Sequence, residues 1–313
     1  MKKRRIGSLQ VSEVGVGCNN FGWRLDAAAT ALVVDAALDS GINFFDTADI
    51  YGKGTSEEYL GKALGHRRKQ VIIATKFGMA MDEKRRGAKP SYVRQAVEDS
   101  LRRLGTDYID LYQLHQPDST TPIADTLGAL DQLVKEGKVR EIGCSNFSPE
   151  QILEAVGQGK LGYAGFESVQ NEYSLLQREA ENYVLPECER LGLTFLPYFP
   201  LANGLLTGKY RKGQPLPGGT RLASSERHSG VLSDQNLSLV ESLISYAEHQ
   251  DRTLLELSIS WLASHAVVAS VIAGATKPEQ VRANARAADW RMTEDGIAEV
   301  NSLLKRHQLR KAS

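Results

Sequence analysis

The sequence is poor in cysteine and has no excess of charge of either sign. Its three cysteines, Cys18, Cys144 and Cys188, lie too far apart for a disulfide framework or a zinc site. Lysines and arginines number 38, and so do aspartates and glutamates, which gives a net charge of zero. Proteins that bind nucleic-acid phosphates normally carry a basic surplus, so we expect no nucleic-acid partner.

Long apolar runs are also missing from the 313 residues. No stretch approaches the roughly 18 apolar residues that cross a bilayer. The basic opening MKKRRIGSLQ lacks the apolar segment of a signal peptide. Together with the few cysteines, these features predict a cytoplasmic protein that does not enter a membrane. No linker or repeat divides residues 1–313, so we expect a single domain, and a monomer by default. No His-x-x-x-His pair indicates a metal.

Short apolar segments alternate with segments of helical periodicity along most of the chain. Residues 4–11 first predict two short strands around a turn at Gly7 and Ser8. The segments with strand character that follow are 14–16, 43–45, 71–75, 109–114, 142–145, 168–170, 194–197 and 270–272.

The intervening segments have an apolar face at helical spacing. Three of them, 27–40, 91–104 and 122–135, stop before or near glycines that suit a helix end. This alternation predicts a parallel sheet, and eight repeats favour a (β/α)8 barrel, although an open doubly wound sheet alternates in the same way. Residues 201–235 predict a long loop, and 293–307 predict an extra helix that we expect to cover one barrel opening.

Four polar residues stand where predicted strands end. Asp46 ends one strand and Tyr51 lies in the turn after it, while Lys76 and His115 end the next two strands. In a closed barrel the carboxyl ends of all strands form one rim, where the catalytic residues of this fold lie. Taken singly, each residue has an ordinary explanation as a helix cap, a packing residue or a solvated loop residue. Their combination on consecutive strands favours a catalytic site.

This set of residues suits the reduction of a carbonyl group, which needs a hydride on carbon and a proton on oxygen. A free tyrosine has a pKa near 10, and a neighbouring cation lowers it. Lys76 would supply that cation, and Asp46 would hold Lys76 and keep it protonated. His115 would orient the carbonyl oxygen. Tyr51 would then act as the general acid in reduction and as the base in oxidation.

The segments around these four residues resemble the aldo-keto reductase superfamily. Residues 43–52 (NFFDTADIYG) are similar to its signature, and 73–76 (IATK) and 107–115 (DYIDLYQLH) are similar to its lysine and histidine strands. The resemblance covers almost the whole chain and extends to the branch related to potassium-channel β-subunits. It implies a (β/α)8 barrel that reduces aldehydes or ketones with NADPH, with Tyr51 as the acid/base.

The same resemblance implies a cofactor site along the rim. The nicotinamide carboxamide would contact Ser145, Asn146 and Gln170, and Tyr198 would stack on the nicotinamide ring near Leu201. The remaining residues that the resemblance implies lie toward the phosphates and the adenosine: Gly208, Lys209, Arg221, Gly274, Thr276, Lys277, Gln280 and Asn284. Four positions depart from the family pattern. Phe199 replaces a serine and Gln280 replaces an arginine, while Gly274 and Ala275 stand where many members have a lysine or serine. The family's arginine, lysine and serine at the last three positions bind the 2′-phosphate. We expect NADPH, with NADH as the alternative.

The substrate is expected to be a small carbonyl compound. Trp23, Phe77 and Phe147 follow or end barrel strands and are candidates for an apolar pocket wall, although core packing explains each of them equally well. Two other functions stay open. One is a regulatory β-subunit that binds the cofactor with weak turnover. The other is a barrel lyase that uses Lys76 as a Schiff base, which would require a neutral lysine.

Overall fold

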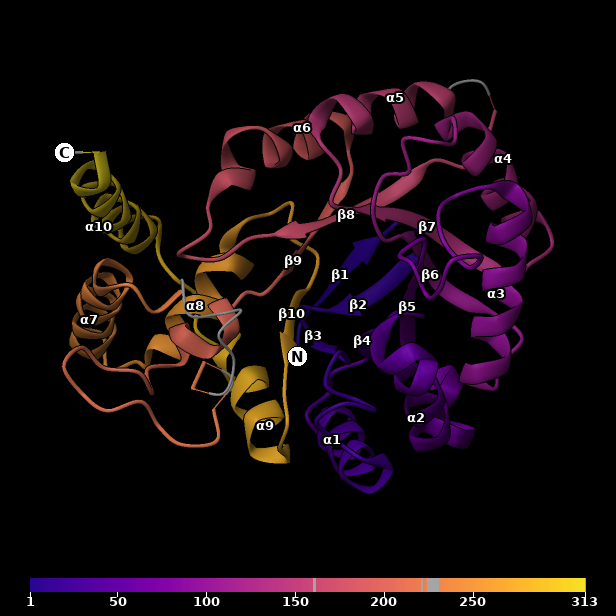
Figure 1. Cartoon of the computed structure of the whole chain (residues 1–313). Coiled ribbons are helices and arrows are strands. Elements are labelled where there is room, and N and C mark those ends of the chain that lie inside the picture. The colour runs from indigo at the N-terminus through magenta and orange to yellow at the C-terminus, as the bar shows by residue number, and fades with distance from the viewer. Residues whose placement is uncertain (160–161, 221, 224–230, 313) are drawn as a thin grey trace.

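The computed structural model describes residues 1–159, 162–220, 222–223 and 231–312, and in this part of the chain eight parallel strands form one sheet (Figure 1). Their order in the sheet is β10-β3-β4-β5-β6-β7-β8-β9. The strands are β3 (Val14–Gly17), β4 (Phe44–Asp46), β5 (Ile72–Phe77), β6 (Ile109–Leu114), β7 (Val139–Ser145), β8 (Phe166–Glu172), β9 (Thr194–Tyr198) and β10 (Val271–Gly274). Each predicted strand segment overlaps one of them.

The sheet closes through a short contact between its two end strands. The Phe195 amide of β9 donates to the Val267 carbonyl over 2.7 Å, and the Ala269 amide donates to the Phe195 carbonyl over 3.0 Å. Phe195 and Val268 thereby form an isolated parallel bridge just before β10. The predicted (β/α)8 barrel is confirmed.

Helices surround the barrel, and their ends follow local sequence signals. The Asp26 side chain accepts a hydrogen bond from the Ala29 amide at the start of the first helix, and Gly105, at φ 64°, ends the third. The α-helices are α1 (Ala27–Asp39), α2 (Thr55–Leu64), α3 (Pro90–Leu104), α4 (Ile123–Lys135), α5 (Pro149–Gly159), α6 (Val184–Leu191), α7 (Asp234–His249), α8 (Leu254–Ser264), α9 (Pro278–Ala287) and α10 (Glu294–Ala312). Short 3-10 helices are η1 (Tyr51–Gly54), η2 (Gly65–Gln70), η3 (Glu179–Asn182) and η4 (Ala202–Thr207). Among the described residues, no helix combines the length and the apolar character needed to cross a membrane.

The N-terminal hairpin fills the barrel interior at the amino-terminal ends of the strands. Its strands β1 (Lys3–Ile6) and β2 (Leu9–Ser12) pair antiparallel, as predicted. Ile6 and Leu9 are buried in one apolar cluster with Phe44 and Leu111 from the barrel strands. A larger cluster fills the layer between the strands and the helices. The site described below therefore occupies the opposite, carboxyl-terminal rim.

The expectation that the C-terminal helix covers a barrel opening is wrong. Helix α10 packs beside α7 on the outside of the barrel (Figure 1). The Tyr246 hydroxyl of α7 donates to the Gly296 carbonyl of α10 over 3.2 Å, and Val300 and Leu304 are buried in the outer core. The physical reason is that the hairpin already fills the amino-terminal opening, while the apolar side chains of α10 join the outer core beside α7.

The segment 201–235 contains no strand among its described residues. It begins with η4, where Ala202, Asn203 and Gly204 all have positive φ, and residues 208–220 contain no helix or strand. This agrees with the predicted long loop and places it directly after β9.

Candidate active site

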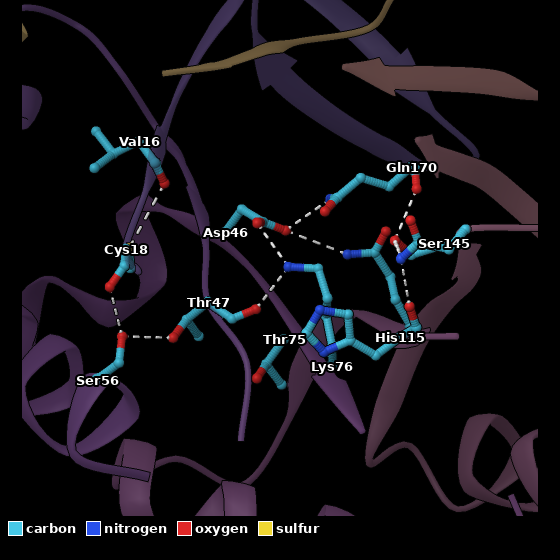
Figure 2. Close-up of polar contacts among 12 residues, drawn as sticks. Val16, Cys18, Asp46, Thr47, Ser56, Thr75, Lys76, His115, Ser145 and Gln170 are labelled. Carbon is cyan, nitrogen blue, oxygen red and sulfur yellow. Dashed lines mark hydrogen bonds and ion pairs between the residues drawn. The ribbon is translucent and has the colours of Figure 1, made fainter. Parts of the chain in front are cut away.

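The four candidate catalytic residues meet at the carboxyl-terminal rim because neighbouring parallel strands end there in register. Asp46 is the last residue of β4 and lies opposite Ala74 of β5, two residues before Lys76. His115 directly follows β6, and Tyr51 begins η1. Figure 2 shows Asp46, Lys76 and His115 pointing into one region.

Lys76 and Asp46 form a buried ion pair. The Lys76 Nζ lies 2.6 Å from Asp46 Oδ2 and also donates to the Thr47 carbonyl over 2.9 Å. Asp46 Oδ1 accepts a hydrogen bond from Gln170 Nε2 over 2.9 Å (Figure 2) and one from Gln113 Nε2 over 3.3 Å. Burial acts to lower the pKa of Lys76. The charges of Asp46 and Tyr51 act to raise it and outweigh the effect of burial, so the pKa of Lys76 lies above its ordinary value. Lys76 is therefore an ammonium at neutral pH.

Tyr51 lies beside this ion pair. Its ring centroid is 5.3 Å from Lys76 Nζ, and the side chain is half-buried. Burial raises the pKa of Tyr51, the Lys76 ammonium offsets this only in part, and Asp46 adds to the rise. The net pKa of Tyr51 therefore lies above its ordinary value. The lysine acts in the expected direction, but desolvation of the phenolate is the larger effect.

His115 is a neutral imidazole next to Tyr51. The two rings meet edge to face with their centroids 5.8 Å apart. Burial, together with the Lys76 charge, lowers the pKa of His115 to about 3. Its Nδ1 is buried and has no hydrogen-bond partner within the described chain. A ring N–H of His115 is thus available as a neutral donor rather than as a cation.

The side chains predicted to hold the nicotinamide carboxamide adjoin the ion pair. Ser145 Oγ donates to the Gln170 carbonyl over 2.7 Å, and Asn146 Nδ2 donates to Ser145 Oγ over 3.1 Å. The Tyr198 hydroxyl donates to Asn146 Oδ1 over 2.8 Å. Asn146 has φ 62°, in the left-handed region that asparagine adopts more readily than most residues with a side chain. The structure therefore brings Ser145, Asn146, Gln170 and Tyr198 together at the ends of β7, β8 and β9.

The loop after β9 carries the next predicted group. Leu201 is half-buried just before η4, and Gly208 ends η4 with φ 83°. Lys209 is exposed, and its Nζ lies 5.2 Å from the centroid of the Tyr210 ring. Arg221 lies outside the described residues.

The turn from β10 to α9 holds the remaining group. Gly274 ends β10, and Gln280 in the first turn of α9 accepts a hydrogen bond from the Thr276 amide over 2.7 Å. Lys277 is exposed at the start of α9, and Asn284 is buried on the same helix. The rim thus offers amides and a hydroxyl at one end and cations and a helix N-terminus at the other. This donor set fits a nicotinamide dinucleotide.

Comparison with known proteins agrees with this geometry. The model of the Aldo/keto reductase family matches residues 13–305. The chain belongs to the aldo/keto reductase family.

Similar proteins include enzymes and a channel subunit. The chain is 36% identical to the uncharacterized oxidoreductase YqkF of Bacillus subtilis, with 97% of each chain covered. It is also 36% identical to a probable voltage-gated potassium channel subunit beta of Oryza sativa, with 92% of each covered. The solved structure of glycerol dehydrogenase AKR11B4 from Gluconobacter oxydans has a TM-score of 0.84 at 32% identity and covers 98% of this chain and 96% of its own.

The aromatic candidates for the substrate wall of this aldo/keto reductase divide into two groups. Trp23 is 62% exposed after β3, with the Arg24 guanidinium 4.9 Å from its ring centroid. Phe77 is fully buried and stacks on Tyr112 with centroids 4.7 Å apart, and Phe147 is buried against Phe166. Phe77 and Phe147 are core residues, because their rings pack between strands and helices. Only Trp23 of the three is presented to solvent near the rim.

Sequence reasoning missed three residues that support this site. Gln113 donates to Asp46, the Thr47 carbonyl accepts from Lys76, and Asn171 Oδ1 accepts from the Asn146 amide over 2.7 Å. Gln113 carries a detectable signal, since it is an amide within a strand segment and lies two residues before His115. The role of the Thr47 carbonyl leaves no trace in side-chain chemistry. Within the described chain, no group of three or more histidines, cysteines, aspartates or glutamates is arranged to hold a metal.

Proposed function

We propose that this aldo/keto reductase transfers a hydride between NADPH and a small aldehyde or ketone, with Tyr51 as general acid and base. The observation that carries the proposal is the buried Lys76–Asp46 pair, whose ammonium lies 5.3 Å from the Tyr51 ring centroid. A phenol beside a fixed cation in a largely water-excluded site is suited to proton transfer at a reacting oxygen.

The proton step follows from the charges in the site. When bound, NADPH supplies the hydride to the carbonyl carbon. Tyr51 gives its proton to the oxygen, and Lys76 stabilises the phenolate that remains. Because the pKa of Tyr51 lies above its ordinary value, the phenol stays protonated at neutral pH and is ready to act as the acid. In the reverse direction, the phenolate takes the proton of the alcohol.

His115 has the role of a neutral hydrogen-bond donor in this proposal. Its pKa of about 3 keeps the imidazole uncharged through the physiological range. A neutral ring N–H can bind the carbonyl oxygen and set its direction toward Tyr51 without competing with Tyr51 as the acid.

We assign the cofactor to the rim residues by their donor sets. Ser145, Asn146 and Gln170 would hold the carboxamide, with Tyr198 against the nicotinamide ring. Leu201 would lie near that ring, and Gly208, Lys209 and Arg221 would line the phosphates. Gly274, Thr276, Lys277, Gln280 and Asn284 would hold the adenosine, where Lys277 offers a charge for the 2′-phosphate. NADPH is the proposed cofactor, and NADH is the alternative because Gln280 is uncharged.

Two other functions have unequal support. A regulatory subunit is the second candidate, because a relative at 36% identity is named as a potassium channel subunit beta. A Schiff-base lyase is disfavoured, since Asp46 keeps Lys76 charged and an ammonium is not a nucleophile.

The glycerol dehydrogenase among similar structures makes small polyols reasonable substrates to test. The three cysteines are free and buried, which suits the reducing cytoplasm that we propose as the location.

The test is nucleotide titration followed by turnover. Quenching of protein fluorescence would be measured with NADPH and with NADH, and nicotinamide absorbance would then be followed with 4-nitrobenzaldehyde. We expect binding of NADPH and reduction of the aldehyde, and in Tyr51→Phe we expect unchanged NADPH binding with a loss of about 100-fold or more in kcat. Binding without turnover would favour the regulatory function. Failure to bind either nucleotide would exclude the proposal.

A further inference from the structure

The Asp46 carboxylate has two amide neighbours with different surroundings. Gln170 lies in the rim next to Ser145 and Asn146, where the proposed function places the nicotinamide carboxamide. Gln113 is fully buried in β6, below the rim and inside the barrel. Because an ionised carboxylate only accepts hydrogen bonds, the Gln113 nitrogen must face Asp46, over 3.3 Å.

The barrel interior confines Gln113 to this orientation. Gly143 of β7 lies in register between Gln113 of β6 and Ser168 of β8. A methyl group on Gly143 would lie 3.3 Å from Gln113 Cγ and 2.5 Å from Ser168 Oγ, so both side chains occupy the space above this glycine. The Gln113 oxygen is buried and has no hydrogen-bond partner within the described chain. The fold thus keeps a buried amide whose one hydrogen bond in the described structure goes to Asp46.

We propose that Gln113 is a positioning residue for the hydride-transfer site: its amide fixes the Asp46 carboxylate with Oδ2 toward Lys76 and offsets part of its negative charge. This inference rests on the proposed function, because it acts through Asp46 and Lys76 on Tyr51. An amide dipole directed at Asp46 Oδ1 weakens the negative potential of the carboxylate. The Lys76 charge then acts more strongly on the phenol.

Gln113 and Gln170 differ in their surroundings, and therefore in how each can serve Asp46. Gln170 belongs to the group of side chains assigned to the carboxamide, so its hydrogen-bonding capacity is shared between that group and Asp46. Gln113 is shut inside the barrel and can serve Asp46 whether or not a nucleotide is bound. Gln113 therefore keeps one donor on Asp46 throughout the reaction cycle.

The charge environment of Tyr51 is otherwise defined by few groups. Lys76 of β5, Asp46 of β4 and Cys18 after β3 act on it electrostatically, and His115 after β6 meets its ring. Tyr198 of β9 also interacts with Tyr51, but burial raises the pKa of Tyr198 to about 12 and keeps it neutral. Of these, the Cys18 thiol is neutral because burial raises its pKa well above the ordinary range, and His115 is neutral because its pKa is about 3. Loss of the Gln113 donor therefore acts on Tyr51 mainly through the Asp46–Lys76 pair, and its sign is a rise in the pKa of Tyr51.

The test is Gln113→Met, which keeps the length of the side chain and removes the donor. The pH profile of kcat with NADPH and 4-nitrobenzaldehyde is expected to keep its shape while its alkaline limb moves up by about half a pH unit, the effect of one neutral hydrogen bond. Direct titration of Tyr51 in nucleotide-free protein gives a readout without turnover. For this, the protein carries 3-fluorotyrosine, its 19F resonance is assigned with Tyr51→Phe, and the same upward shift is expected.

Stability distinguishes positioning from a structural role. The Gln113 side-chain oxygen is buried without a hydrogen-bond partner within the described chain, which costs stability. Replacing Gln113 by methionine removes this oxygen and is therefore expected to leave the thermal midpoint unchanged or to raise it. Ser168→Ala is the matched control, since Ser168 Oγ is buried in the same layer without a partner and no described contact joins it to Asp46. In this control, the alkaline limb of the kcat profile is expected to stay at the wild-type pH. Gln113→Glu adds a negative charge and is expected to move the alkaline limb to a higher pH than Gln113→Met does.

The outcomes separate this inference from the proposed function. Suppose that Tyr51→Phe abolishes turnover, while Gln113→Met changes neither the alkaline limb of the kcat profile nor the 19F titration of Tyr51. The proposed role of Gln113 would then be wrong, and the proposed reductase function would be retained. If Gln113→Met lowers the thermal midpoint without moving the titration, Gln113 is only structural. If Tyr51→Phe retains full turnover, the proposed function fails first.

Discussion

The ammonium nitrogen of Lys76 lies 2.6 Å from Oδ2 of Asp46, and both side chains are buried at the end of the barrel. An ion pair out of water is tolerated only when its remaining hydrogen-bonding positions are filled. Here the Thr47 carbonyl binds the ammonium, and Gln113 and Gln170 bind the second carboxylate oxygen. The fold therefore holds a buried, hydrogen-bonded ammonium–carboxylate pair at the rim.

Removing the carboxylate is predicted to impair folding stability and chemistry together. In Asp46→Asn, Lys76 loses its counter-ion inside the barrel, and a buried charge left unpaired costs about 3–5 kcal/mol. Thermal unfolding and kcat should both fall. The matched control is Asp35→Asn, which breaks the more exposed Arg67–Asp35 pair at 2.7 Å. This control should change stability by less than about 1 kcal/mol and leave kcat intact. Equal effects of the two substitutions would contradict a special role of the buried pair.

Asp49 is predicted to weaken the fold as the pH rises. It is buried, its Oδ1 has no partner within the described chain, and burial together with Glu57 raises its pKa from 3.8 to about 7. The folded protein therefore holds a proton on Asp49 that the unfolded chain releases near pH 4. Stability falls between about pH 4 and 7 by on the order of 4 kcal/mol, and the loss persists above pH 7.

Asp49→Asn should remove this dependence, as thermal unfolding at several pH values would reveal. The stability gained over the wild type is expected to be small at pH 4, to grow as the pH rises to about 7 and then to stay constant. Asp118→Asn is the control of opposite sign. Hydrogen bonds from the Ala88 amide and Thr120 lower the pKa of Asp118 to about 2, so its stabilisation is complete above about pH 4 and lost only in strong acid. A pH-independent gain for Asp49→Asn would show that Asp49 is ionised in the fold.

Much of the fold could be predicted because its local signals agree. The strands appear as short apolar segments, and caps such as Asp26 and Gly105 mark helix ends. The four candidate catalytic residues are also visible in the sequence, because parallel strands bring their carboxyl ends to one rim. Periodicity and strand order suffice for these features.

Packing choices could not be predicted in the same way. Phe77 could face either the rim or the core, and its burial against Tyr112 depends on which face of β5 the barrel turns inward. The placement of α10 beside α7 depends on the hairpin, which already fills the amino-terminal opening of the barrel. The pKa of Tyr51 depends on a balance between burial and the Lys76 charge, and residue types alone do not set this balance.

The hairpin is predicted to stabilise the barrel without taking part in the site. Leu9 is buried among Ile6, Phe44 and Leu111, at the amino-terminal ends of the strands. Leu9→Ala should leave a cavity there and cost about 2–5 kcal/mol of stability, measured by denaturant unfolding, while NADPH affinity stays unchanged. Leu32→Ala, on the exposed face of α1, is the control and should cost about 0.5 kcal/mol or less. A parallel loss of nucleotide affinity in Leu9→Ala would show that the two ends of the barrel are coupled.

Cofactor preference is predicted to respond to the residue at position 280. Gln280 is exposed in the first turn of α9, and its oxygen accepts from the Thr276 amide. An arginine there would present its guanidinium near Lys277, where the proposed site receives the 2′-phosphate, and a charge-assisted contact contributes about 1.5–3 kcal/mol. Gln280→Arg should therefore tighten NADPH by about tenfold while NADH affinity stays constant or falls slightly, because the Thr276 contact is lost. Fluorescence titration measures both affinities, and Gln280→Met serves as the control that removes the Thr276 contact without adding charge. If Gln280→Arg tightened NADPH and NADH equally, the added charge would be acting on a phosphate common to both nucleotides, and the 2′-phosphate would have to be assigned elsewhere on the rim.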